Sequence, residues 1–114
     1  MSEVPARRPS ILHPLRAALV VVDLQEKLLP AIEGRDRVVK NSLLLLRLAE
    51  ILRLPVILTS QYKKGLGEIL PEVRAAAPGN PPIDKVAFGC FGDPGFQERL
   101  KNLPGRDQLV VTGV

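Results

Sequence analysis

The 114-residue sequence predicts an α/β fold with three layers, α/β/α, built around a parallel sheet. Short continuous apolar runs rich in Val, Ile and Leu alternate along the chain with segments of helical periodicity. Continuous apolar runs are typical of strands covered on both faces, and the alternation is typical of right-handed crossovers between parallel strands. Hydrophobic residues make up 46% and charged residues 25%, as in ordinary globular proteins, so we expect one domain over residues 17–114.

The first predicted strand covers residues 17–23. Asp23 ends this strand, and open α/β sheets place their ligand crevices at the carboxyl ends of strands. A helix is expected from about residue 37 to 53, with Asp36 as its N-cap. The apolar face of this helix, which includes most of residues 43–52, is wide enough to contact the sheet and also another helix or subunit. We therefore expect a homo-oligomer.

A second strand is predicted at residues 56–59. The proline- and glycine-containing stretch 60–82 predicts a long loop with at most one helical turn, of the kind that lines a site. Beyond it we expect a short strand at 83–88, a helix over 93–102 with proline at its first position, and a last apolar strand at 108–112.

Composition argues against several classes of partner. The net charge is +4, but residues 1–16 contribute half of it, which indicates a basic, proline-containing lead-in and not a basic face. With one Tyr and no Trp the chain offers little for stacking on bases, so no nucleic acid is expected. No apolar run reaches the roughly 18 residues of a membrane span. The single cysteine fits a reducing compartment, and we expect the cytoplasm.

Four motifs follow one another in the chain: VVVDLQEKL, LTSQYKKGLG, DKVAFGCF and LVVTGV. Together they resemble the isochorismatase-like cysteine hydrolases, most closely the small-hydrolase branch whose loop reads TxQYxxGLG. The resemblance covers nearly everything from residue 17 to residue 114 and implies a Rossmann-like topology. Each motif alone is weak evidence, whereas four in order are strong.

The resemblance implies a catalytic Asp, Lys and Cys. Asp23 matches the Asp, which takes the proton of the thiol. Lys85 matches the Lys, which stabilises the anionic state that results. The thiolate would attack the carbonyl of a small carboxamide or related substrate, and water would then hydrolyse the acyl-enzyme intermediate. The family's cysteine follows the TGV strand by a few residues, and the sequence ends at Val114. We therefore expect a domain that is incomplete at its C-terminus and inactive by itself.

Cys90 lies where the resemblance implies no nucleophile, so we expect a packed small hydrophobic residue there. Gln61 is expected to hydrogen-bond substrate, or alternatively to fix its own loop, and Tyr62 and Phe88 are further candidates for substrate contacts. The sequence has one histidine, His13, which is too few for the ligands of a zinc site, so no metal is expected.

No cofactor is expected either, because Gly65-Leu66-Gly67 lacks the last glycine of a dinucleotide-binding loop. Two other interpretations stay open. The chain could be a catalytically inactive, truncated remnant that serves as an oligomerisation or binding module through residues 43–52. It could also be an unrelated flavodoxin-like ligand-binding domain, if the order of the motifs is a coincidence. In these cases Asp23 would cap a turn and Lys85 would be a solvated lysine.

Overall fold

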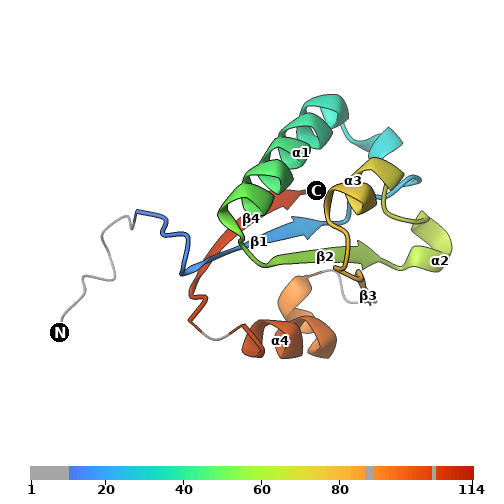
Figure 1. Cartoon of the computed structure of the whole chain (residues 1–114). Helices are drawn as coiled ribbons and strands as arrows, with labels where there is room; N and C mark the ends of the chain where they lie inside the picture. Colours follow the sequence, from blue (N-terminus) through green and yellow to red (C-terminus); the bar gives the residue numbers. More distant parts are fainter. Residues whose placement is uncertain (1–10, 87–88, 104) are drawn as a thin grey trace.

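The computed structural model describes residues 11–86, 89–103 and 105–114. These residues contain a four-stranded sheet in the order β3-β2-β1-β4, and each strand runs parallel to its neighbours (Figure 1). The strands are β1 (Ala17–Val22), β2 (Val56–Gln61), β3 (Ile83–Lys85) and β4 (Gln108–Gly113). The predicted α/β class with a parallel sheet is therefore confirmed.

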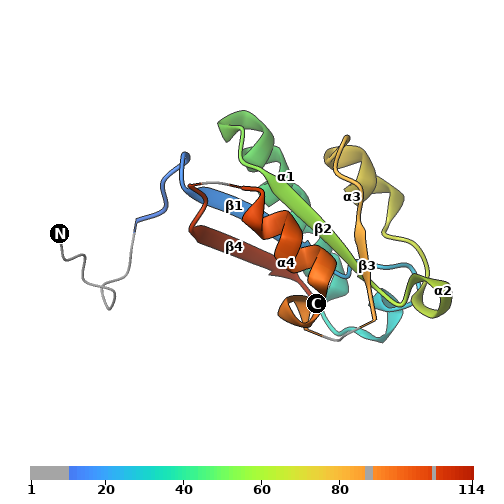
Figure 2. The ribbon, with the colours of Figure 1, turned by 90° about the horizontal axis from the view of Figure 1, so that it is seen from below.

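Helices cover both faces of the sheet. Helix α1 (Arg35–Leu52) and the short helix α3 (Pro71–Ala76) lie on one face, and α4 (Pro94–Lys101) lies on the other (Figures 1 and 2). Side chains of a strand point alternately to the two faces, so β1 contributes to both cores. Leu19 and Val21 join the core under α1, whereas Val20 packs with Phe96 of α4. Burial on both faces explains why β1 is a continuous apolar run.

Helix α1 begins directly after a glycine and not at the predicted cap. Gly34 adopts a left-handed conformation with φ of 76°, and its carbonyl accepts from the N–H groups of Arg37 and Val38. Asp36 lies inside the first turn and makes no side-chain capping bond, so the prediction of Asp36 as N-cap was wrong. Glycine turns the chain here because it adopts positive φ at no steric cost.

The stretch 60–82 is more ordered than predicted. Residues 60 and 61 belong to β2, and two short helices follow, α2 (Lys63–Leu66) and α3. Ile69, Val73 and Ala77 recur every four residues and are buried in the core under α1. An antiparallel bridge between Gln25 and Ile69 ties the stretch to the segment that follows β1.

The remaining elements follow the prediction closely. Helix α4 starts at Pro94, and the Asp93 carboxylate accepts from the backbone N–H of Phe96 at 2.9 Å. Strand β3 is shorter than expected, because it ends at Lys85, and residues 87 and 88 lie outside the described residues. In the part of the chain that the structure describes, no helix is both long and apolar enough to cross a membrane.

Candidate active site

The polar residues singled out in the sequence lie at one edge of the sheet. Asp23 directly follows β1, Gln61 is the last residue of β2, and Lys85 is the last residue of β3. Because these strands are parallel and adjacent, their carboxyl ends meet at the same edge. This is the edge where open α/β sheets bind ligands.

Asp23 and Lys85 form a buried ion pair across β2. The Lys85 Nζ lies 2.8 Å from Oδ2 of Asp23, and the Lys85 and Asp23 side chains are 0% and 6% exposed, respectively. The other carboxylate oxygen, Oδ1, accepts from the Thr59 hydroxyl at 2.8 Å. Lys85 also donates to Oε1 of Gln61 at 3.2 Å. A desolvated ion pair is tolerated only when such additional hydrogen bonds hold it, so the four residues form one connected polar group.

The backbone at Asp23 is unusual for a residue with a side chain. Its φ is 55°, in the left-handed region, and its N–H still donates to the Thr59 carbonyl at 3.0 Å. Aspartate tolerates this region better than most residues, although glycine would adopt it more readily. The turn ends β1 and directs the carboxylate toward the end of β3.

Gln25, two residues later, is completely buried and was not predicted from the sequence. Its Oε1 accepts from the Gln61 N–H at 2.7 Å, and its Nε2 donates to the carbonyls of Gln61 and Gly67 at 3.0 and 2.9 Å. The side chain therefore holds the end of β2 and the start of the following loop against the end of β1. Thr59 was also missed, because a single threonine in an apolar strand gives no distinguishing signal.

Gln61 makes the contacts of a residue that fixes its own surroundings. Its Nε2 donates to the Val86 carbonyl at 2.8 Å, while its Oε1 accepts from Lys85. Tyr62 is 55% exposed, and its ring lies over Gly65, where an added Cβ would be 2.5 Å from Cε2 of the ring. The third candidate for a substrate contact, Phe88, lies outside the described residues.

Cys90 belongs to the core on the α4 side of the sheet. It is partly buried against the cluster of Val20, Ile57 and Phe96. Burial raises the pKa of the Cys90 thiol, and although the Lys85 ammonium acts in the lowering direction, the net shift is upward. A thiol with a raised pKa is mostly protonated at neutral pH, which is unlike an activated nucleophile.

A hollow of about 720 Å³ lies away from the ion pair, between α1 and the segment after β1. Among the described residues there is no group of three or more His, Cys, Asp or Glu side chains placed to hold a metal ion.

Comparison with known proteins identifies the family to which this chain belongs. The family model described as Isochorismatase domain matches residues 17–114, so the chain belongs to the isochorismatase family, as the sequence motifs indicated. Members of this family are hydrolase-like α/β proteins, and the parallel sheet fits that assignment.

The relatives that this chain matches are longer than the chain itself. The chain is 37% identical to isochorismatase domain-containing protein 2 of Danio rerio over 98 residues, which is 86% of this chain and 48% of the relative. It also resembles the Escherichia coli YcaC product, with a TM-score of 0.82, 33% identity, and coverage of 94% of this chain and 54% of that one.

A third relative is the Caenorhabditis elegans MAR1 ribonuclease, with a TM-score of 0.81, 32% identity, and coverage of 91% of this chain and 53% of that one. The chain thus spans about half the length of the curated relatives it matches.

Proposed function

We propose that Asp23 and Lys85 are the base and the cation of a hydrolase that acts on a small carboxamide or a related carbonyl compound. The observation that carries the proposal is the buried ion pair, with 2.8 Å between Lys85 Nζ and Asp23 Oδ2. Asp23 takes the proton of a nucleophilic thiol, and Lys85 stabilises the anionic state that results. The cysteine that the family resemblance implies is not among the 114 residues, so these residues supply the base and the cation only.

The register of the sheet supports this division of roles. Val22 pairs with Gly113 across β1 and β4, and the Val114 N–H donates to the Val22 carbonyl at 3.0 Å. Neighbouring strands lie about 4.8 Å apart. A turn that followed Val114 would therefore start beside Asp23, within reach of its carboxylate for a side chain of cysteine length.

We assign a small-molecule substrate and not a nucleic acid. The Caenorhabditis elegans relative is named a ribonuclease, but in this chain half of the net charge of +4 comes from residues 1–16, which precede the first strand in the sequence. Phosphate contacts supply most of the affinity for nucleic acid, and they need clustered cations. The Escherichia coli relative is described as an octameric hydrolase of unknown specificity, and we extend homo-oligomerisation to this protein, which we place in the cytoplasm.

A second candidate is an inactive binding module. It is favoured by α1, where Leu44, Leu48 and Ile51 follow a helical spacing and are exposed. Such a stripe is unusual on the surface of a monomer. The two candidates differ in what they predict for catalysis by the protein that carries the Asp23–Lys85 pair.

The test compares the 114-residue chain with the longest product of the reading frame that encodes it. Both are assayed against a panel of small carboxamides and a single-stranded RNA oligonucleotide. We expect the longer product to hydrolyse a carboxamide and the shorter chain to hydrolyse none. Asp23→Asn and Lys85→Met in the longer product should each lower kcat/KM by about a thousandfold or more, because members of a catalytic set act as a unit.

Asp107→Asn is the matched control, since Asp107 is an exposed carboxylate that pairs with Arg16 at the amino ends of β4 and β1, at the edge of the sheet opposite the site. Its kcat/KM should stay within about twofold of the parent value. Hydrolysis that survives Asp23→Asn and Lys85→Met unchanged would refute the proposal, as would cleavage of RNA alone. A longer product without any turnover would favour the binding module.

A further inference from the structure

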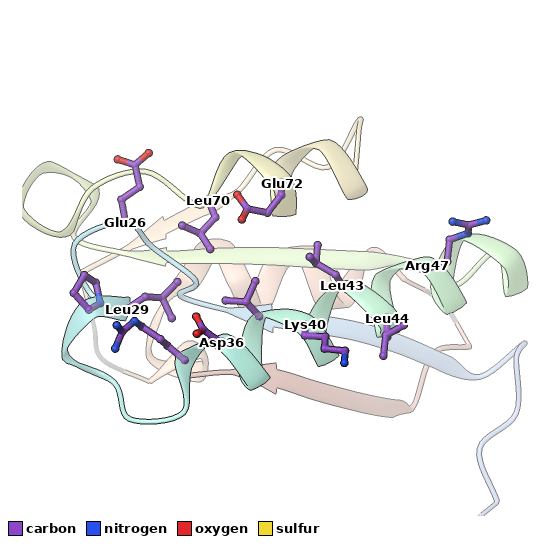
Figure 3. Close-up of a pocket in the computed structure, with 12 residues that line it drawn as sticks. Glu26, Leu29, Asp36, Lys40, Leu43, Leu44, Arg47, Leu70 and Glu72 are labelled. Carbon is purple, nitrogen blue, oxygen red and sulfur yellow. The ribbon is translucent and has the colours of Figure 1, made fainter.

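A groove follows α1 on the face that the catalytic proposal does not use. It lies between α1 and two segments, the stretch after β1 and the start of α3, and has a volume of about 720 Å³ (Figure 3). Four apolar side chains line its inner part: Leu29, Val39, Leu43 and Leu70. On α1 the lining runs from residue 35 to residue 47, which is about 18 Å at 1.5 Å per residue.

The charges on the two sides of this groove are opposite. The α1 side carries Arg35, Lys40 and Arg47 with one carboxylate, Asp36, so its net charge is +2. The other side carries Glu26 and Glu72, so its net charge is −2. In Figure 3 these two glutamates lie above the groove, whereas Lys40 lies on α1 below it.

None of these six side chains has an ion pair or a side-chain hydrogen bond in the described ranges 11–86, 89–103 and 105–114, where the ion pairs are Arg16–Asp107, Lys63–Glu68 and Lys85–Asp23. Rows of unpaired charge beside an apolar floor are typical of the rim of an interface. Leu44 adds to this, because it lines the groove and is 60% exposed.

We propose that this groove is an interface between two copies of the chain, related by a two-fold axis that runs parallel to α1. Such an axis turns one copy over so that its negative side faces the partner's positive side, and the same contact repeats on the other half. A two-fold interface must be self-complementary, and sides of equal and opposite net charge satisfy that requirement. Leu44 of each copy then covers the apolar floor of the other.

The groove fits a second copy better than a small ligand. Its length along α1 exceeds that of most metabolites, and its charges are spread along both sides instead of converging on one point. The proposal is independent of the assigned catalytic roles of Asp23 and Lys85, which lie at the carboxyl edge of the sheet and do not line the groove.

Charge reversal tests the geometry directly. One variant reverses the negative side, Glu26→Lys with Glu72→Lys, and another reverses the positive side, Lys40→Glu with Arg47→Glu. All four residues are exposed, so each variant should fold, and circular dichroism checks that it does. The mass of each protein is then measured by light scattering and by sedimentation over a concentration series.

We expect each variant alone to have half the mass of the parent chain, with a dimer Kd raised by at least about tenfold, because like charges then face each other. An equimolar mixture of the two variants should regain the parent mass, since each contact is again between opposite charges. The chain with all four reversals should also regain it.

The matched control is Lys63→Glu with Glu68→Lys, an exchange of exposed charges outside the groove that should leave the mass unchanged. The proposal is overturned if the parent chain is monomeric across the series, if either groove variant keeps the parent mass, or if the mixture remains dissociated.

Discussion

The side-chain amide of Gln25 bonds to both the N–H and the C=O of Gln61, at 2.7 and 3.0 Å. This pattern is the one that a backbone peptide group makes in a sheet. Strand β1 has ended at Val22 and the chain has turned at Asp23, so the glutamine side chain replaces the missing strand residue. It thereby positions the residue whose Oε1 accepts from Lys85.

Replacing this amide should loosen the site as well as the fold. Gln25→Leu removes three hydrogen bonds made by a completely buried side chain, and we expect it to lower the free energy of unfolding by about 2–4 kcal/mol. Urea unfolding measures this loss, and hydrogen exchange should show faster exchange of the Gln61 amide. Gln97→Leu, at an exposed glutamine whose side chain donates to the Phe91 carbonyl, should cost less, about 1 kcal/mol or below. Equal effects of the two changes would contradict the role of Gln25.

Removing one member of the ion pair should cost more than removing both. Lys85→Met leaves the Asp23 carboxylate buried without its cation, and we expect a loss of about 3 kcal/mol in urea unfolding. The double variant, Asp23→Asn with Lys85→Met, leaves no buried charge of the pair, so it should be more stable than Lys85→Met alone. A double-mutant cycle measures the difference, and purely additive single effects would show that the two side chains do not interact.

Gly113 should be irreplaceable for a steric reason. A Cβ at this position would lie 2.7 Å from the Val22 nitrogen, and φ is +119°, which residues with side chains rarely adopt. Gly113→Ala should therefore separate the carboxyl ends of β1 and β4 and lower the melting temperature by several degrees. Gly89→Ala is the control, because nothing lies within 4 Å of the Cβ position at Gly89 and its φ is −84°. An unchanged melting temperature for Gly113→Ala would contradict the close approach of β1 and β4 at this point.

Two aspartates near helix starts should differ in their effect on stability. Asp93 accepts a capping hydrogen bond from Phe96, so Asp93→Ala should cost about 1 kcal/mol. Asp36 makes no capping bond and contributes only through the helix dipole, so Asp36→Ala should cost about 0.3 kcal/mol. Thermal unfolding of the two variants in parallel tests the contrast, and the reverse order would restore Asp36 as the cap.

Alkylation should report the environment of Cys90. Because burial raises the pKa of this thiol, the folded chain should react with iodoacetamide more slowly at neutral pH than the urea-unfolded chain does. The alkylation rate of the folded chain should also begin to rise at a higher pH than that of the unfolded chain, since the reactive thiolate forms at a higher pH. Mass spectrometry follows the reaction, and faster labelling of the folded protein would indicate an activated thiol.

The strands were predictable because each has a strong local signal. Residues 17–22 and 109–111 are continuous apolar runs, and such a run can be recognised in the sequence alone. The prediction of α4 rested on Asp93 and Pro94, which act within a single turn. By contrast, α3 spans six residues and would be marginal in isolation, so it depends on burial of Val73 under α1, a contact with a segment far away in the sequence.

The candidate site was predictable only in part. Asp23 and Lys85 stand at strand ends and match family motifs, so the sequence indicated them, and the structure brings them together. Gln25 and Thr59 act through contacts between segments 36 residues apart, and such contacts leave no trace in local composition. The cap at Gly34 was missed because aspartate is the commoner N-cap and competed as an explanation.

The left-handed backbone at Asp23 affects which substitutions this position would accumulate during evolution. Asp23→Gly would relieve the backbone strain and remove a buried charge, so stability alone would favour this change together with the loss of Lys85. A lineage that kept only the scaffold should lose this pair early, whereas a lineage under selection for chemistry should keep both residues. Sequencing close orthologues would therefore separate a working site from an inherited relic without any knowledge of the substrate.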